Sequence, residues 1–514
     1  MTDASAARGA PGSPAGSTGG TGLPATAAAS LMRVVTAARW FAGKGRRPEL
    51  RSFTPLPWLN DPSDAGPAGP DADPAEEVPR VRLAVIEVAY PDEAAAVEHY
   101  QLALAHRRRR VPAGTSAGTE LYVDDDGSVV HDATQDVGGA RVLLQALLAG
   151  TEVASETGSV RFHLRDAAGL TPDLEPQVFR GQQSNTSVMF GDVAMLKLFR
   201  RLELGRNLDI QVHAALNDAQ TTDVARLFGS VEATWSNLGE VLGADLAMCV
   251  EKLADAVDGW DLALASLGAE TRGARPGDGS GADVGAGFAA HAAALGRALA
   301  EVHDALRTAF GTSTQAGTTV AATMTQRLDR AAAVAPALLP YVDGLRERFA
   351  ALRGAELDAQ RVHGDFHLGQ TLHTPSGWKI IDFEGEPAKN LAERVAPDSV
   401  WRDVAGMMRS FDYAAASVPG DAAGSWRDGC RAAFLDGYTD GRGLGAADAG
   451  LLAAYEADKA VYEVVYEVRN RPDWVGIPLG AVATLAAPPD RAGAAGAATP
   501  DPPINDGSQP EELV

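Results

Sequence analysis

The chain has 514 residues, a length that allows about three domains of ordinary size. It carries 68 acidic residues against 45 Lys and Arg, and its formal net charge is -23. A charge of this sign repels phosphate backbones and anionic lipid headgroups, so we expect no nucleic acid and no membrane surface among its partners.

The cysteine content and the N-terminus bear on the compartment. Cys249 and Cys430 are too few for a disulfide framework and lack metal-ligand spacing, so both are expected to be core thiols in a reducing environment. The N-terminal segment has no apolar stretch of the kind found in signal peptides, and no other segment approaches the ~18 apolar residues of a membrane span. These features favour a cytoplasmic protein.

Segments without hydrophobic periodicity divide the chain. They are rich in Gly, Ala, Pro, Asp and Ser, and they comprise residues 1–29, 60–77, 268–287 and 485–514. We interpret them as a disordered tail, a loop insertion, a surface loop and a second disordered tail.

Between these segments, three predicted regions follow one another. Short alternating runs such as 81–89 and 120–123 predict a small β-rich domain over residues 30–170. Residues 171–250 are expected to contain a hairpin, a helix and a further strand pair, which we interpret as a small N-lobe. Residues 251–484 are predicted to form a mainly helical C-lobe.

The helical region contains a well-marked amphipathic segment, residues 288–310. Leu295, Leu299 and Val302 recur in it at three- and four-residue spacing, which predicts a helix with one buried face. His303 lies in the same segment. It either packs under the loop described next or is an ordinary core histidine.

The strongest chemical signal is the run Val362 to Gln370, which reads VHGDFHLGQ and precedes Asp382 at the end of an apolar strand. Phosphoryl transfer to an alcohol requires a carboxylate that orients the hydroxyl and accepts its proton, together with oxygen ligands for Mg²⁺. Asp365 fits the first role, whereas Gln370 and Asp382 fit the second. Their spacing resembles the catalytic loop and the Asp-Phe-Gly aspartate of kinases, with Gln in place of Asn.

A turn or a strand-end cap would explain either half of this pattern alone, but not both halves at kinase spacing. We therefore predict phosphoryl transfer from ATP. His363 and His367 are expected to brace the loop backbone rather than to react.

A kinase also needs a cation against the α- and β-phosphates, and Lys197 is the candidate. It lies in the apolar run Val193 to Phe199, which predicts a buried strand. A lysine in such a strand needs an anionic partner, either a phosphate or a carboxylate.

Polar residues precede this strand. Ser184, Asn185, Thr186 and Ser187 offer hydroxyl and amide groups that can cover phosphates, as a glycine-rich loop does. Runs of this composition are often plain loops, so both interpretations stay open.

Several separate blocks of sequence resemble the bacterial maltokinases, which are relatives of the aminoglycoside phosphotransferases with an added N-terminal cap domain. The blocks are residues 39–46, 184–187, 196–201, 362–387, 402–413 and 462–474. The resemblance implies an α+β fold that is bilobal and protein-kinase-like (aminoglycoside phosphotransferase-like), preceded by a small β-rich cap domain.

The resemblance also implies an activity. ATP and Mg²⁺ would support transfer of phosphate to the anomeric hydroxyl of maltose, giving maltose 1-phosphate, and a trehalose synthase that supplies maltose is an expected partner. Asp365 would be the base, Gln370 and Asp382 the metal ligands, and Lys197 the phosphate contact. Glu384 would support either the metal or the sugar.

The implied sugar pocket lies in the helical region. Asp403, Tyr466, Arg469 and Trp474 offer hydrogen bonds and a stacking face there. The helical spacing of the residues around Tyr466 fits plain packing equally well.

One position departs from the family pattern. The family has Asn-Pro-Asp-Ile-Glu after the lysine strand, whereas Asn207 to Gln211 reads NLDIQ here. Because Gln211 cannot balance the charge of Lys197, we expect weaker activity or a substitute carboxylate, with Glu203 and Asp209 as the candidates.

Two alternatives to a maltose kinase stay open. One is a kinase of another sugar or aminosugar, such as glucosamine. The other is a nucleotide-binding scaffold with weak turnover, which Gln211 favours and the intact Asp365, Gln370 and Asp382 disfavour.

Overall fold

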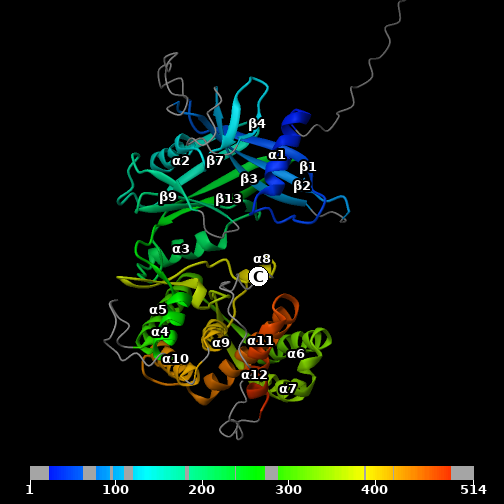
Figure 1. Cartoon of the computed structure of the whole chain (residues 1–514), viewed down its shortest axis with the longest axis vertical. Helices are drawn as coiled ribbons and strands as arrows, with labels where there is room; N and C mark the ends of the chain where they lie inside the picture. Colours follow the sequence, from blue (N-terminus) through cyan, green and yellow to red (C-terminus); the bar gives the residue numbers. More distant parts are fainter. Residues whose placement is uncertain are drawn as a thin grey trace, which may run out of the picture. The chain divides into compact units, whose positions relative to one another are not determined.

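A computed structural model describes residues 22–61, 77–92, 97–108, 120–179, 185–237, 239–271, 287–386, 389–418, 420 and 422–487. The chain divides into two compact units (Figure 1). The first comprises Met1–Gly191, Met195–Gly205 and Gly229–Cys249, and the second comprises Asp192–Ala194, Arg206–Phe228 and Val250–Val514.

The first unit begins with helix α1 and an antiparallel sheet. The elements are α1 (Ala25–Ala37), β1 (Glu49–Trp58), β2 (Arg80–Ala89), β3 (Val97–Arg107), β4 (Glu120–Val123) and β5 (Val129–Asp132), and the strands lie in the order β1-β2-β3-β5-β4. The short strand β11 (Arg201–Leu202) pairs with β3. The strands predicted at residues 81–89 and 120–123 are confirmed.

Helix α1 starts inside the segment that we interpreted as a tail. Ala27, Leu31 and Val35 are four residues apart and buried, and they join a core with Phe53 and Tyr100 of the sheet. The alanine-rich composition that suggested a tail is equally compatible with a helix, and burial of this one face decides between them.

A second sheet follows helix α2 (Val137–Ala149). Its strands are β6 (Glu152–Ser155), β7 (Gly158–Leu164), β8 (Pro176–Val178), β9 (Thr186–Phe190), β10 (Ala194–Leu198), β12 (Leu227–Asn237) and β13 (Glu240–Glu251), in the order β6-β7-β12-β13-β10-β9-β8. Because β7 pairs with β12 through Phe162 and Val231, this sheet begins before the predicted boundary at residues 170 and 171. A separate cap domain at that boundary stays a prediction.

The second unit is mainly helical. Its α-helices are α3 (Leu208–Asp218), α4 (Gly259–Thr271), α5 (Phe288–Phe310), α6 (Gly317–Val334), α7 (Val342–Ala350), α8 (Leu391–Val395), α9 (Trp401–Ser417), α10 (Ala423–Tyr438), α11 (Ala446–Asn470) and α12 (Gly476–Ala486). Short 3₁₀ turns occupy Pro336–Tyr341, Ala351–Gly354, Leu368–Gln370 and Pro472–Trp474.

Small strands accompany these helices. Strands β14 (Val257–Asp258), β17 (Thr371–Thr374) and β18 (Gly377–Ile380) form one sheet in the order β14-β17-β18. Strand β15 (Thr312–Ala316) pairs with β16 (Glu356–Gln360). Strand β16 ends one residue before the predicted catalytic run, with Arg361 between them.

Helix α5 contributes its apolar face to the helical core. Its bounds match the predicted segment 288–310, and its apolar face is buried as the periodicity indicated. It lies beside α10 (Figure 1), at glycines that allow a close approach. A Cβ added at Gly296 would lie 2.2 Å from the backbone oxygen of Phe434, and one at Gly437 would lie 2.0 Å from that of Ala293. Larger residues would force the helices apart.

Both cysteines are free and buried, as predicted for core thiols. In the part of the chain that the structure describes, no helix is long and apolar enough to cross a membrane.

Candidate active site

The β17–β18 hairpin brings the two halves of the catalytic pattern together. Thr371 pairs with Ile380, and the amide of Ile381 donates to the carbonyl of Gln370 at 3.1 Å. This register sets Gln370 beside Asp382, and Nε2 of Gln370 donates to Oδ2 of Asp382 at 3.4 Å. The β17–β18 hairpin therefore explains why Gln370 and Asp382, which are separated in the sequence, are in contact.

Asp365 is buried and paired with a lysine that the sequence analysis missed. Nζ of Lys459, on α11, lies 3.1 Å from Oδ1 of Asp365. Burial raises the pKa of Asp365, but the positive charge of Lys459 outweighs it and holds this pKa below its usual value. Lys459 follows Asp458 and precedes the apolar Ala460 and Val461, so no wholly apolar run singled it out in the sequence.

Further charges surround this pair. Burial lowers the pKa of Lys459, but the carboxylates of Asp365 and Glu386 raise it more, so that the amine stays protonated. Glu386 forms an ion pair with Arg402, whose Nε also donates to the carbonyl of Gly364 at 3.0 Å. The negative charges of Asp365 and Glu386 are thus balanced by the positive charges of Lys459 and Arg402, which fix the position of the loop.

Three carboxylates gather at the end of β18. Oxygens of Asp209, Asp382 and Glu384 lie within 4.8 Å of one another. They offer hard oxygen ligands of the kind that Mg²⁺ prefers, so these three residues can hold a divalent cation. Asp209, which we considered as a partner for Lys197, was missed as a member of this group because it lies far away in the sequence.

The backbone at Asp382 is strained and locked in place. Asp382 has φ of 65°, a left-handed conformation that costs a non-glycine residue energy. The next amide, that of Phe383, donates to Oδ1 of Asp209 at 3.2 Å, and Nδ1 of His213 lies 2.9 Å from the same oxygen. Asp209 therefore fixes the turn that presents Asp382.

Asp403, predicted as a sugar contact, is fully buried beneath the catalytic loop. Its Oδ2 accepts from the amide of His363 at 2.7 Å, and its Oδ1 accepts from the amide of Gly364 at 2.8 Å. His303 of α5 contacts Oδ2 through Nε2 at 3.0 Å. Burial raises the pKa of Asp403, but the hydrogen bond from His303 lowers it below its usual value. Both oxygens are engaged within the protein, so these contacts make Asp403 a brace.

The two loop histidines also contact the backbone, as we expected. Nε2 of His363 lies 2.9 Å from the carbonyl of Ile381, and Nδ1 of His367 accepts from the amide of Gly369 at 3.1 Å. Burial lowers the pKa of His367 to about 4, so its ring is neutral and carries its proton on Nε2. That nitrogen is buried and has no hydrogen-bond partner among the described residues.

The predicted acceptor residues lie near the end of α11. Arg469 is exposed, whereas Tyr466 and Trp474 are half-buried. The guanidinium of Arg471 lies 5.3 Å from the ring centre of Tyr466 and 5.1 Å from that of Trp474, and it is paired with Glu467 at 2.8 Å. Tyr466 and Trp474 thus flank an internal arginine, which supports the packing alternative for these two rings.

The predicted phosphate contacts of the first unit lie on neighbouring strands. Lys197 is half-buried on β10, with Nζ 6.0 Å from the ring centre of Phe199. Oγ1 of Thr186, on β9, accepts from Nε of Arg200 at 2.7 Å, and Ser187 is buried. Asn185 is half-buried just before β9.

Two remaining sequence predictions concern single positions. Ser184 lies outside the described residues. Gln211 lies on α3, and its Nε2 donates to the carbonyl of Arg206 at 3.3 Å.

Comparisons with known proteins agree with this arrangement. Residues 271–449 match the model of the phosphotransferase enzyme family, a range that includes the catalytic run and Asp382. A glucosamine kinase of Streptacidiphilus jiangxiensis is 30% identical over 361 residues, which cover 65% of this chain and 78% of the relative. A glucosamine kinase of Mycolicibacterium smegmatis (strain ATCC 700084 / mc(2)155) is 27% identical over 325 residues, covering 59% of this chain and 77% of that protein.

Solved structures resemble the fold. A glucosamine kinase in complex with glucosamine, ADP and inorganic phosphate has a TM-score of 0.61 at 23% identity, with 88% of this chain and 98% of that chain covered. A second crystal structure of a glucosamine kinase has a TM-score of 0.58 at 25% identity, covering 83% and 97%. The predicted kinase-like fold class is confirmed. The chain therefore belongs to the phosphotransferase enzyme family and is an aminoglycoside phosphotransferase-like kinase.

Proposed function

We infer that the chain transfers the γ-phosphate of ATP to a hydroxyl of a sugar, and that an aminosugar such as glucosamine is a better candidate acceptor than maltose. One observation supports phosphoryl transfer most directly. The buried Asp365 lies on the same short loop as Gln370, and Gln370 contacts Asp382. The choice of acceptor depends on the relatives, because those described above are named glucosamine kinases.

The site residues suit the chemistry. The low pKa of Asp365 keeps this side chain ionised at neutral pH, so that it can orient the acceptor hydroxyl and receive its proton. The hydroxyl oxygen would bond to the γ-phosphorus while the bond from that phosphorus to its bridging oxygen breaks, leaving ADP. His367, with its proton on Nε2, can donate to a phosphate oxygen or to the acceptor.

A magnesium ion fits the carboxylate group. Asp209, Asp382 and Glu384 would hold it through carboxylate oxygens, and Gln370 would join them with its amide turned so that the oxygen faces Asp382; when bound, the ion would neutralise charge on the phosphates. Lys197 is proposed to contact the α- and β-phosphates. Ser184, Asn185, Thr186 and Ser187 are proposed to cover them.

Maltose was the acceptor implied by the maltokinase resemblance, and a trehalose synthase partner depends on the same resemblance. The names of the relatives favour the aminosugar alternative instead. Among the predicted acceptor residues, the exposed Arg469 is the best candidate contact, since Asp403 is engaged beneath the loop.

A panel of acceptors tests the proposal. The purified protein is incubated with ATP, Mg²⁺ and glucosamine, maltose, glucose or N-acetylglucosamine, and ADP release and the phosphorylated product are measured. We expect kcat/KM for glucosamine to exceed that for maltose by about tenfold or more. The reverse order would restore the maltose assignment.

The Asp365→Asn variant tests the base. Its activity should fall by about 100-fold or more, because Asn cannot accept the proton. Activity that survives this change would show that the base lies elsewhere. Absence of product from the unmodified protein with every sugar would instead favour the scaffold alternative.

A further inference from the structure

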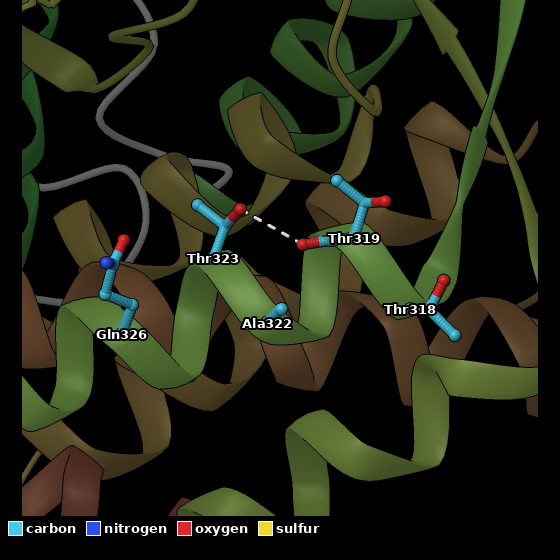
Figure 2. A pocket seen from close by; sticks show the side chains of 5 residues that line it. All are labelled: Thr318, Thr319, Ala322, Thr323 and Gln326. Carbon is cyan, nitrogen blue, oxygen red and sulfur yellow. Dashed lines mark hydrogen bonds between the residues drawn. The ribbon is translucent and has the colours of Figure 1, made fainter.

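Two hollows among the described residues of the helical unit differ in construction. One lies along a single helix, α6, and is lined by the exposed Thr318, Thr319, Ala322, Thr323 and Gln326 (Figure 2). In it, the hydroxyl of Thr323 donates to the carbonyl of Thr319 at 3.0 Å, as a threonine on any helix surface can. This hollow offers no buried group to a ligand.

The other hollow is a cavity of about 850 Å³ between β16, the start of α9, the end of α10 and the start of α11. We call it the β16–α11 cavity. Its size falls within the range of small-molecule pockets. Among the described residues that line it, none belongs to the phosphoryl-transfer site, so a ligand here would occupy a separate place.

A buried amide lines this cavity with one atom unsatisfied. Gln360 is 1% exposed, and its Nε2 donates to the carbonyls of His303 at 2.8 Å and Arg361 at 3.4 Å. These two acceptors fix the orientation of the amide, which leaves Oε1 as the acceptor. Oε1 has no hydrogen-bond partner in the part of the chain that the structure describes. A buried acceptor of this kind is costly unless a ligand or water donates to it.

The rest of the lining matches a neutral, hydroxyl-bearing ligand. Trp401 and Tyr438 contribute aromatic rings that meet edge to face with centres 5.8 Å apart, and Ser399 contributes a buried hydroxyl. Charged groups of both signs also line the cavity, and Arg307 is paired with Asp358 at 2.5 Å. Two arginines (Arg307 and Arg442) and three carboxylates (Glu356, Asp358 and Asp448) line it, and this small net charge offers a strongly charged ligand little net attraction.

We propose that the β16–α11 cavity is a second, non-catalytic binding site for a neutral polyhydroxylated compound, a free sugar being the simplest member of the class. Oε1 of Gln360 is closed off from solvent in this structure, so the amide shifts toward the cavity when a ligand hydroxyl donates to it, and the apolar face of the ring packs on the aromatic side chains. This site goes beyond the proposed kinase activity and does not depend on which sugar is phosphorylated.

The cavity is joined to the catalytic loop by a short chain of hydrogen bonds. The hydroxyl of Tyr438 lies 2.9 Å from Nδ1 of His303, whose Nε2 contacts Asp403, the brace beneath His363 and Gly364. Burial raises the pKa of Tyr438, so its hydroxyl remains a donor. A ligand that orders Tyr438 and Gln360 therefore stiffens the base of the loop.

Blocking variants test the site. Gly450 lines the cavity, and a Cβ added there meets no heavy atom within 4 Å, so Gly450→Trp places a bulky ring at the cavity without displacing the helix. Gly429→Trp is the matched control, since Gly429 is an exposed helical glycine with equally open surroundings and does not line the cavity. Ala447→Trp, at another exposed lining position, repeats the block independently.

Titration calorimetry of the full chain with glucose, maltose and trehalose measures binding directly. At least one sugar should bind the Gly429→Trp variant and bind both blocking variants about tenfold more weakly. The comparison between variants is needed because an acceptor sugar also binds near Asp365. The proposed site would be ruled out if Gly450→Trp, Ala447→Trp and Gly429→Trp bound every sugar with equal affinity. It would also be ruled out if the control Gly429→Trp bound no sugar.

Hydrogen exchange tests the link to the loop. On sugar binding, amides of residues 361–370 should gain protection in the Gly429→Trp control and not in Gly450→Trp. Tyr438→Phe removes the hydroxyl that contacts His303 but keeps the ring, so it should bind the sugar without the gain in loop protection. Protection that persists in Tyr438→Phe would overturn the link. These readouts need no turnover, so the kinase proposal can fail without affecting them.

Discussion

The catalytic loop, residues 361–370, is held differently from residues 466–474, which comprise the end of α11 and the 3₁₀ turn after it. Asp365 is held by the half-buried Lys459 of α11, and the amides of His363 and Gly364 are held by the buried Asp403 of α9. At the end of α11, Asn470 and Arg471 contact residues one turn earlier, and Arg469 is exposed.

The difference suggests a division of labour. Buried partners from several elements determine the loop geometry, so a change in any of them should act on the chemical step. An exposed helix end can change its side chains without disturbing the fold, so it suits acceptor selection. The following predictions test this comparison.

The largest effect is expected from Lys459→Met. It leaves Asp365 buried without its counter-charge, which raises the pKa of Asp365 and costs about 3–5 kcal/mol of stability. We expect kcat at pH 7 to fall by about 100-fold, with partial recovery as the pH rises and Asp365 ionises. Steady-state kinetics against pH and urea unfolding measure these effects.

Two controls accompany this variant. Lys459→Arg keeps the charge and should retain more activity than Lys459→Met. Lys252→Met removes an exposed ion pair, in which Nζ of Lys252 lies 2.6 Å from Oδ1 of Asp192. This change should leave stability unchanged. Full activity of Lys459→Met would show that the loop does not need its buried partner.

Asp403→Asn should have the next largest effect. An amide cannot accept from both loop amides and His303 as a carboxylate does, so about 1–3 kcal/mol of stability should be lost. We expect kcat to fall about tenfold while the acceptor KM stays within about twofold. A raised KM with unchanged kcat would instead make Asp403 the sugar contact that the sequence predicted.

Arg469→Ala addresses the other region. Because this side chain is exposed, stability should not change, and the acceptor KM should rise about tenfold at constant kcat. Arg330→Ala, which removes an exposed arginine of α6, is the control and should leave the KM unchanged. A loss of kcat in Arg469→Ala would contradict the proposed division.

The smallest effect concerns Asp223, which lies outside both regions. Burial and the negative charge of Glu301 raise the pKa of Asp223 to about 6, so its contribution to stability is lost as the pH rises from about 4 through 6. Asp223→Asn should remove this pH dependence and be more stable than the unmodified protein at pH 7.5. Urea unfolding at pH 5 and 7.5 measures the difference, and identical curves for both proteins would contradict it.

Local patterns predicted much of the fold. Helix α5 matches the periodic segment 288–310, and β10 forms where the apolar run around Lys197 indicated a strand. From the sequence, we interpreted the start of helix α1 as part of a tail and placed strands β6 and β7 in a different domain from β12. Their assignment depends on burial against a sheet and on pairing with β12, which lies far along the chain.

The sequence by itself determined which side chains form the centre of the candidate site, because Asp365, Gln370 and Asp382 lie on one loop and one hairpin whose spacing is local. Only the tertiary structure decided the surroundings of these residues. Lys459 and Asp209 reach the site from α11 and α3, and Asp403 lies beneath the loop. Such contacts join residues that are far apart in sequence, and they form because a buried charge must find a partner wherever the packed helices supply one.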